Sequence, residues 1–143
     1  MKLWNQNSKD KNSAIDHFLS SEDITLDQEL FLYDIEASIA HTHELEKINI
    51  FTKTEARKVI SSLKKLGKLF KTNKFKLTAK YEDCHSAIED FLTRELGSIG
   101  KKIHTGRSRN DQIIVAMRLY AREKLDEIQS INLKIAKAFL EKS

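Results

Sequence analysis

The feature that most constrains the fold is a long apolar repeat at the C-terminal end of the chain. Over residues 111–143 apolar side chains recur at every third or fourth position, the spacing of one face of an α-helix. At 1.5 Å per residue such a helix is about 50 Å long, and no other segment is long enough to cover it. The stretch is therefore predicted to join a helical bundle, with partners from other subunits or from further sequence. The repeat consists of Ile114, Met117, Ala121, Leu125, Ile128, Ile131, Ile135 and Phe139.

Composition supports an all-α protein. The 143 residues include no proline and only four glycines, the two residues that most often interrupt helices. The 25 basic and 21 acidic residues are interspersed along the chain, which predicts a mixed surface without a nucleic-acid-binding stripe. No run of about 20 apolar residues predicts a membrane span. A single cysteine, Cys84, excludes an internal disulfide framework and suits a reducing cytoplasm.

The first predicted core helix follows a polar N-terminal segment and has acidic residues at its entrance. Residues 1 to about 20 are polar and aperiodic, and we expect an extended arm there. The first helix is predicted to begin near Leu26, with Asp23 and Asp27 at its entrance, where acidic side chains complement the helix dipole. Its apolar face is formed by Leu26, Leu30, Tyr33, Ala37 and Ala40.

Two further helices follow. Thr52 and Glu55 have the spacing of a capping box and start a helix whose buried side includes Val59, Leu63 and Leu66. Residues 71–80 are lysine-rich and predicted to form a loop. A third helix is predicted from about Glu82 to Leu96, stopped by Gly97. His85 and Glu89 are four residues apart on it, which allows a His–carboxylate pair or an ordinary surface contact.

The segment His104–Gln112 combines two arginines, an asparagine, an aspartate, two hydroxyls and a histidine around one glycine. A glycine-containing loop that leads into a helix N-terminus favours anions, and arginine forks suit carboxylate or phosphate. The other interpretation is a basic connector in which Asn110 or Asp111 caps the next helix. Cysteine and histidine form no compact metal-ligand set in the sequence, and no P-loop or dinucleotide fingerprint is present.

Four sequence blocks, in order, resemble the N-terminal part of argininosuccinate lyases, which are members of the fumarase/aspartase superfamily. The block Lys102–Gln112 is highly specific, and the other three support it. These are Lys2–Trp4, Tyr33–Ile35 with Ser38–His41, and Glu82–Ser86. The similarity extends over essentially the whole chain.

The resemblance implies β-elimination of argininosuccinate to arginine and fumarate, without a metal or organic cofactor. It implies that Asn110, Arg109, Thr105 and Ser108 bind substrate and that Asp27 meets the cationic arginine end. His85 is implied to support hydrogen bonding at the active site. Asp23 stands where many members have a substrate-contacting serine, which leaves its role open. Arg109 and Asn110 are expected to face the ligand, whereas Arg107 is a candidate anchor of the loop to its own fold.

The resemblance also implies how the chain is organised. Residues 1–110 would form an N-terminal helical domain with the arm and the loop, and residues 111–143 the start of a central bundle domain that builds a homotetramer. The family's catalytic histidine and serine would lie beyond Ser143, so this chain alone is expected to be inactive. The implied process is arginine biosynthesis in the cytoplasm, with a small-molecule substrate and neither nucleic acid nor membrane as partner.

Two other functions remain open from sequence. One is a non-enzymatic, crystallin-like structural relative, against which the intact Asp27, Arg109 and Asn110 argue. The other is a small basic nucleic-acid-binding helical protein that uses Lys101, Lys102, Arg107 and Arg109. This nucleic-acid-binding alternative predicts a steep salt dependence of binding. The interspersed acidic residues disfavour it.

Overall fold

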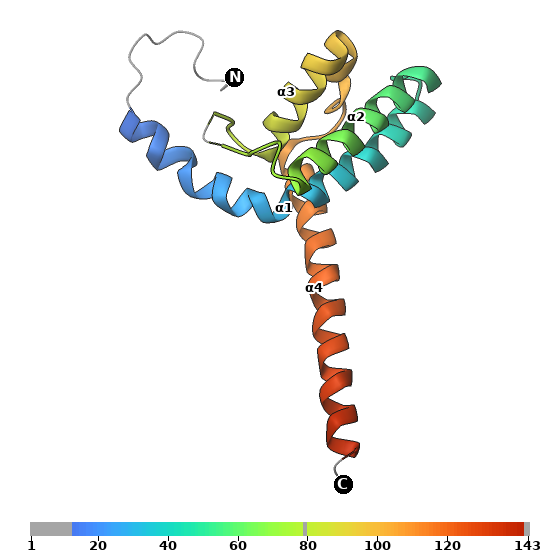
Figure 1. The fold of residues 1–143 in the computed structure, drawn as a ribbon. Coiled ribbons are helices and arrows are strands. Elements are labelled where there is room, and N and C mark those ends of the chain that lie inside the picture. The colour runs from blue at the N-terminus through green and yellow to red at the C-terminus, as the bar shows by residue number, and fades with distance from the viewer. Residues whose placement is uncertain (1–12, 79, 142–143) are drawn as a thin grey trace.

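The described part of the chain is all-α, as the composition predicts (Figure 1). In the computed structural model, the backbone is described for residues 13–78 and 80–141 and the side chains for 27–78 and 80–141. The elements are α1 (Ser13–Lys47), α2 (Lys53–Lys71), α3 (Cys84–Leu96), the 3-10 helix η1 (Gly97–Lys102) and α4 (Arg109–Leu140). None of these helices combines the length and hydropathy that crossing a membrane requires.

Helix α1 begins much earlier than the sequence pattern indicates. It starts at Ser13, so the prediction of an extended arm is wrong for residues 13–20, and residues 1–12 lie outside the described residues. The predicted start near Leu26 is wrong as well. Residues 13–26 contain neither glycine nor proline, so no residue in them interrupts the helix. Asp23 and Asp27 therefore lie inside α1 and not at its entrance, where a dipole interaction was expected.

Local signals set the limits of the next two helices. Thr52 caps α2: the Glu55 backbone N–H donates to Thr52 Oγ1 (3.2 Å) and the Thr52 N–H donates to Glu55 Oε2 (2.8 Å), which confirms the predicted capping box. Asp83 caps α3 by the same exchange with Ser86. Helix α3 ends where predicted, because Gly97 adopts φ +63°. The described residues between Lys71 and Cys84, 72–78 and 80–83, are non-helical, in agreement with the predicted loop.

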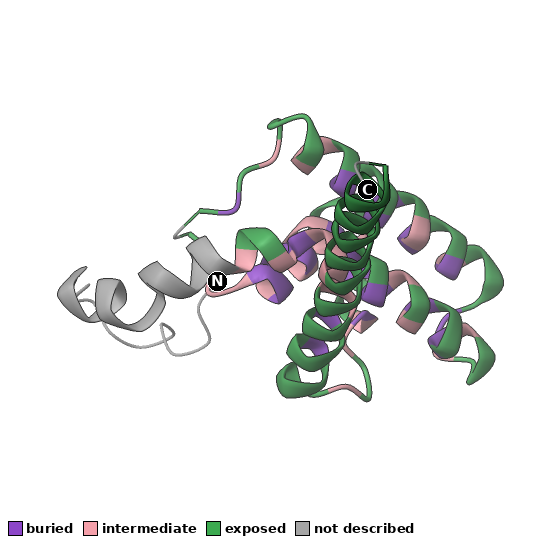
Figure 2. Cartoon of the chain, turned by 90° about the horizontal axis from the view of Figure 1, so that it is seen from below, coloured by how far each residue is buried: buried purple, intermediate pink, exposed green. Residues whose placement is uncertain are grey.

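The core lies among α1, α2, α3 and the segment between α2 and α3 (Figure 2). The Phe31 ring on α1 packs against Phe70 at 4.6 Å and stacks on Phe75 at 5.7 Å, measured between ring centroids. Burial of these side chains supplies most of the driving force for folding. Side chains less than 2% exposed include Phe31, Leu45, Phe51, Val59, Leu63, Leu66, Ile88, Leu92 and Ile103.

Helix η1 turns the chain back toward α1 and depends on a glycine. A Cβ on Gly100 would lie 2.4 Å from the backbone carbonyl carbon of Leu92 and 2.6 Å from the backbone nitrogen of Thr93. Both atoms belong to the backbone of α3, which cannot move aside as a flexible side chain does. This close approach fixes the direction in which the chain enters the segment 103–108 and, after it, α4.

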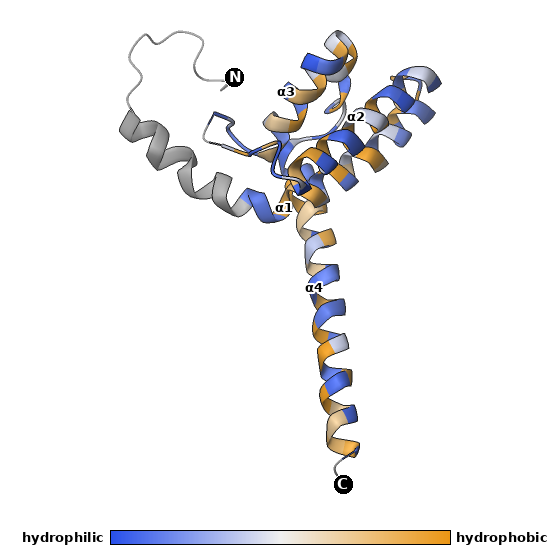
Figure 3. Ribbon diagram, in the orientation of Figure 1, coloured by the Kyte–Doolittle hydropathy of each residue, from blue (hydrophilic) through white to orange (hydrophobic). Residues whose placement is uncertain are grey.

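Helix α4 projects away from the other helices (Figures 1 and 3). Only its first turns are packed: Gln112 and Ala116 are buried, and Tyr120 meets Tyr33 edge-to-face at 5.6 Å. The predicted apolar repeat is present and exposed, for example Leu125 at 65% and Phe139 at 74%. Exposed apolar surface of this extent is unusual for a monomer and typical of an interaction surface.

We expect Gly100→Ala to lower the free energy of unfolding by about 1–3 kcal/mol, because the new methyl group overlaps the α3 backbone. Gly67→Ala is the matched control. Its Cβ would lie 3.8 Å from Ile35 Cδ1, an ordinary contact, and alanine in a helix interior stabilises by about 0.5–1 kcal/mol. Urea unfolding of both variants measures the difference, and equal stabilities would contradict this role of Gly100.

Candidate functional site

The segment His104–Gln112 joins η1 to α4 and contains the helix cap. Ser108 is the N-cap of α4: its hydroxyl accepts from the Asp111 N–H (3.2 Å), and the Ser108 N–H donates to Asp111 Oδ2 (2.9 Å). The capping interpretation is therefore partly right, but the cap is Ser108 and not Asn110 or Asp111. Gly106 takes φ +71°, which L side chains rarely adopt. A capped helix start can still present its free N–H groups to an anion.

A buried acid–imidazole pair lies beneath this segment. His85 Nδ1 on α3 is 2.6 Å from Asp34 Oδ2 on α1, and the two side chains are 4% and 0% exposed. The predicted pairing of His85 with Glu89 is wrong. His85 lies on the face of α3 that also carries Ile88 and Leu92 and packs inward, whereas Glu89 lies on a partly exposed flank. A buried polar group without a hydrogen-bond partner is costly, so each side chain stabilises the other in place.

Three hydrogen bonds attach the segment to α1 and α3. His104 Nε2 lies 3.3 Å from the backbone oxygen of His85. His41 Nε2 lies 3.0 Å from the backbone oxygen of Thr105. Arg107 Nη2 donates to Ser38 Oγ over 3.4 Å, which agrees with the predicted role of Arg107 as an anchor. Because the acceptors for the two histidines are carbonyl oxygens, each Nε2 carries the hydrogen.

Burial and neighbouring charge keep these histidines neutral. Burial lowers the pKa of His104 to about 4, and the Arg107 guanidinium contributes to that lowering. The pKa of His41 is also lowered, first by burial and then by Arg107. Burial lowers the pKa of Arg107 as well, opposed by attraction to Asp34 and Asp111. The segment therefore carries its positive charge on arginine rather than on histidine.

Several buried polar atoms in this region have no hydrogen-bond partner within the described residues. They belong to α1, to the segment before α4 and to the first turn of α4, and buried polar atoms are normally paired. They leave hydrogen-bonding capacity close to the Asp34–His85 pair. The atoms are Asp34 Oδ1, His104 Nδ1, Arg107 Nε and Gln112 Oε1.

Arg109 pairs with acidic residues at the start of α3. Its guanidinium contacts Glu82, and its Nε lies 2.8 Å from Asp83 Oδ2. The pair connects the N-termini of α3 and α4, a contact that sequence reasoning missed because the residues are far apart in the chain. Arg109 also lines a surface cavity of about 350 Å³ with Glu82, Ser86, Glu89, Asp90, Thr93 and Lys101. Asn110 is exposed beside it, and its side chain has no hydrogen-bond partner among the described residues.

Asp27 reaches the same end of α3. Its Oδ2 accepts from the Cys84 backbone N–H over 2.9 Å, at the helix N-terminus. Burial raises the pKa of Asp27, and the Cys84 N–H bond opposes that rise. The structure thus brings Asp27, His85 and Arg109 together around the start of α3. The side chain of Asp23 lies outside the described residues, so its role stays a prediction.

Asp34, Cys84 and His85 each present one potential metal-ligand atom within 4.8 Å of the others. Sequence spacing did not reveal this group, because Asp34 comes from a different helix. Its chemistry does not favour a metal: burial raises the pKa of the Cys84 thiol far above its ordinary value, so the ligand form of that sulfur is strongly disfavoured. Asp34 Oδ2 and His85 Nδ1 already pair with one another.

Comparison with known proteins decides the family. The family model described as lyase matches residues 8–143. The chain belongs to the lyase family. It is 45% identical over 141 residues to the argininosuccinate lyase of Xanthomonas euvesicatoria pv. vesicatoria, covering 99% of this chain and 33% of that protein. The argininosuccinate lyase of Xylella fastidiosa is 43% identical over 99% of this chain and 32% of its own length.

The resemblance stated from the sequence blocks is therefore confirmed. The argininosuccinate lyase of Stenotrophomonas maltophilia is also 43% identical over 99% of this chain and 33% of its own length. This member of the lyase family spans about a third of the length of the curated relatives it matches.

The neutral state of His104 predicts a dependence of stability on pH. The folded-state pKa of about 4 lies below the ordinary value of 6.5, so the unfolded chain binds a proton that the folded chain does not. Stability should fall by roughly 2–3 kcal/mol as the pH decreases from about 7 toward 4. His104→Gln retains a donor for the His85 carbonyl and should show a flatter profile in urea unfolding. Parallel profiles for both proteins would contradict this assignment.

Proposed function

We propose that the complete protein cleaves argininosuccinate to arginine and fumarate by β-elimination, and that the residues described here bind and orient the substrate. The similarity to argininosuccinate lyases over nearly the whole chain supports this reaction. The observation that carries the proposal is the position of Asn110. It lies exposed in the first turn of α4, next to Arg109. The Arg109 side chain reaches Asp83 at the start of α3, where Asp27 accepts from the Cys84 N–H.

The succinate half of the substrate carries two carboxylates, the arginine half ends in an α-ammonium and an α-carboxylate, and a guanidinium joins the two halves. The site offers groups that suit both anionic and cationic parts. Asn110 provides an amide donor and acceptor next to the free backbone N–H groups at the start of α4, an arrangement that favours a carboxylate. Asp27 provides a carboxylate that suits a guanidinium. Thr105 is exposed near this helix start and is retained as a substrate-binding candidate, as is Ser108, whose hydroxyl also caps α4.

We assign a positioning role to His85. Its ring is almost fully buried, and its Nδ1 is held by Asp34, so substrate does not reach that nitrogen without rearrangement. Its backbone oxygen instead holds His104. Proton transfer is therefore assigned to groups outside residues 27–141. This is the expected division of labour if the family's catalytic histidine and serine follow in the longer relatives, and it predicts that the 143-residue chain alone forms no fumarate.

We further propose that the complete protein is a homo-oligomer, a tetramer by family resemblance, that acts in arginine biosynthesis in the cytoplasm. In this scheme residues 1–110 form the N-terminal domain and residues 111–143 begin the bundle. The apolar repeat exposed along α4 supports assembly through that helix. No metal or organic cofactor is required by this proposal. Nothing observed favours the crystallin-like alternative.

In the complete protein, Asn110→Ala should lower kcat/KM about fivefold or more, which corresponds to a lost contact of about 1 kcal/mol, with an unchanged Tm. The Tm is expected to hold because the side chain is exposed and supports nothing in the fold. Arg109→Ala should lower both kcat/KM and Tm, because Arg109 also ties α4 to Glu82 and Asp83.

Fumarate formation, followed by ultraviolet absorbance, measures kcat/KM, and thermal unfolding measures Tm. Thr54→Ala, an exposed polar side chain in the first turn of α2, is the control and should change neither. If the folded Asn110→Ala protein keeps full kcat/KM, Asn110 does not bind substrate and the assigned site is wrong.

A further inference from the structure

The mixed distribution of charge that whole-chain composition predicts does not hold for one stretch of the chain, residues 53–80. Residues 53–80 contain ten of the 25 basic residues and one of the 21 acidic residues, Glu55. The remaining 15 basic and 20 acidic residues lie elsewhere, so this stretch has a net charge of +9 and the rest of the chain −5. The whole-chain charge of +4 averages over this difference. We call the ten residues the α2 basic surface: Lys53, Arg57, Lys58, Lys64, Lys65, Lys68, Lys71, Lys74, Lys76 and Lys80.

All ten cations are exposed, and they are largely unneutralised. Among the described residues only Lys65 forms an ion pair, with Glu95 at 2.8 Å. Glu55, the only acidic residue in the stretch, is occupied by the Thr52 capping box and by Lys102 at 3.2 Å. The α2 basic surface therefore presents a concentrated positive field to solvent, which attracts polyanions over several ångströms.

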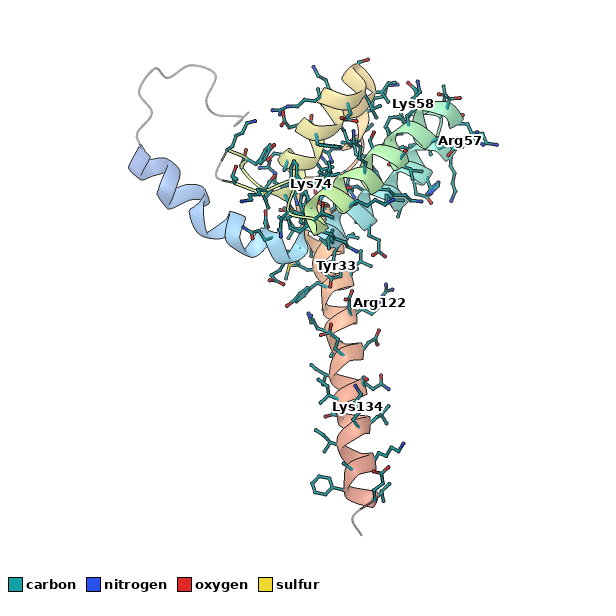
Figure 4. All side chains as sticks on the ribbon, viewed as in Figure 1. Tyr33, Arg57, Lys58, Lys74, Arg122 and Lys134 are labelled. Carbon is teal, nitrogen blue, oxygen red and sulfur yellow. The ribbon has the colours of Figure 1, made fainter. Side chains whose placement is uncertain are left out.

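The cations extend along the whole of α2 and beyond its C-terminal end. Figure 4 shows Arg57 and Lys58 near one end of the helix and Lys74 past the other. Lys64, Lys68 and Lys71 follow the three-and-four spacing of one helical face, and they line a hollow of about 620 Å³ that Glu29, Glu36 and Glu123 also line. Lys64, Lys65, Lys68 and Lys74 line a surface hollow of about 540 Å³ together with Ser61 and Thr72. At 1.5 Å per residue, α2 spans about 28 Å.

We propose that the α2 basic surface binds double-stranded nucleic acid through its phosphate backbone, without reading the base sequence. A duplex carries one negative charge per about 1.7 Å of its axis, so a 28 Å helix faces on the order of sixteen charges. Flexible lysines match such a surface as point charges. This binding is independent of the proposed lyase activity and uses none of its residues.

The chemistry of the surface favours a duplex over a single strand. Single-strand binders stack exposed bases on aromatic side chains. The aromatic residues in this stretch, Phe70 and Phe75, are instead packed on Phe31 in the core. Isolated small anions are also poorly matched, because exposed lysines on flexible stems do not enclose them.

Fluorescence anisotropy of a labelled duplex of about 20 base pairs, titrated with the 143-residue chain between about 50 and 200 mM salt, tests the proposal. The logarithm of the association constant should fall linearly with the logarithm of the salt concentration, with a slope of about −4. The triple variant Lys64→Gln, Lys68→Gln, Lys74→Gln should make this slope less negative by about 3. It should also weaken binding at least tenfold at the lowest salt concentration.

The matched control is Arg118→Gln, Arg122→Gln, Lys134→Gln, which removes three exposed cations from α4 and gives the same net charge. It should bind the duplex as the unmodified chain does. Equal weakening by both triple variants would assign the effect to net charge and overturn the proposal. Tighter binding to single strands or to phosphatidylserine vesicles than to the duplex, or no salt-dependent binding, would overturn it as well. Circular dichroism confirms that both variants remain helical.

Discussion

The buried pair between Asp34 and His85 is the contact on which the arrangement of the site depends. It joins the middle of α1 to the first turn of α3, and the backbone oxygen of the same histidine holds His104. Arg107 and His41 add contacts between the following segment and α1. Removing one partner leaves the other buried without its hydrogen bond, which typically costs about 1–3 kcal/mol. One pair of residues therefore links two helices and the start of a third.

Local sequence signals predicted those parts of the fold that local interactions determine. The Thr52–Glu55 capping box, the stop at Gly97 and the apolar repeat of α4 depend on residues within a few positions of one another. The start of α1 was missed because residues 1–20 were interpreted as one polar segment. Ile15, Phe18 and Leu19 in fact have the three-and-four spacing of a helical face, and no glycine or proline interrupts residues 13–26. The partner of His85 was missed because spacing of four residues identifies Glu89 as a neighbour on the helix but says nothing of the helix packed opposite.

The candidate site was found largely through its motif and only partly through its chemistry. The segment 104–112 and its residues Arg109 and Asn110 were identified from sequence, whereas Asp34 was not given a role. A signal for it existed: Asp34 and Ser38 are four apart and continue the buried face of Phe31, where an acid needs a partner. The α2 basic surface was missed because the charge was averaged over the chain instead of counted by segment. Tertiary contacts such as Arg109 with Asp83 have no local signature.

Hydrogen exchange of backbone amides most directly tests whether the Asp34–His85 pair holds the segment before α4. In Asp34→Asn, the amides of Ile103, Thr105 and Arg107 should exchange faster, while α2 keeps its protection. These amides donate to the carbonyls of Gly100, Lys102 and His104 in η1 and at the start of the segment. Thr42→Val is the control, because the Thr42 hydroxyl bonds only its own helix at Ser38 O (2.7 Å), and it should leave these amides protected. Unchanged exchange of the segment in Asp34→Asn, or loss of protection throughout α2, would contradict the account.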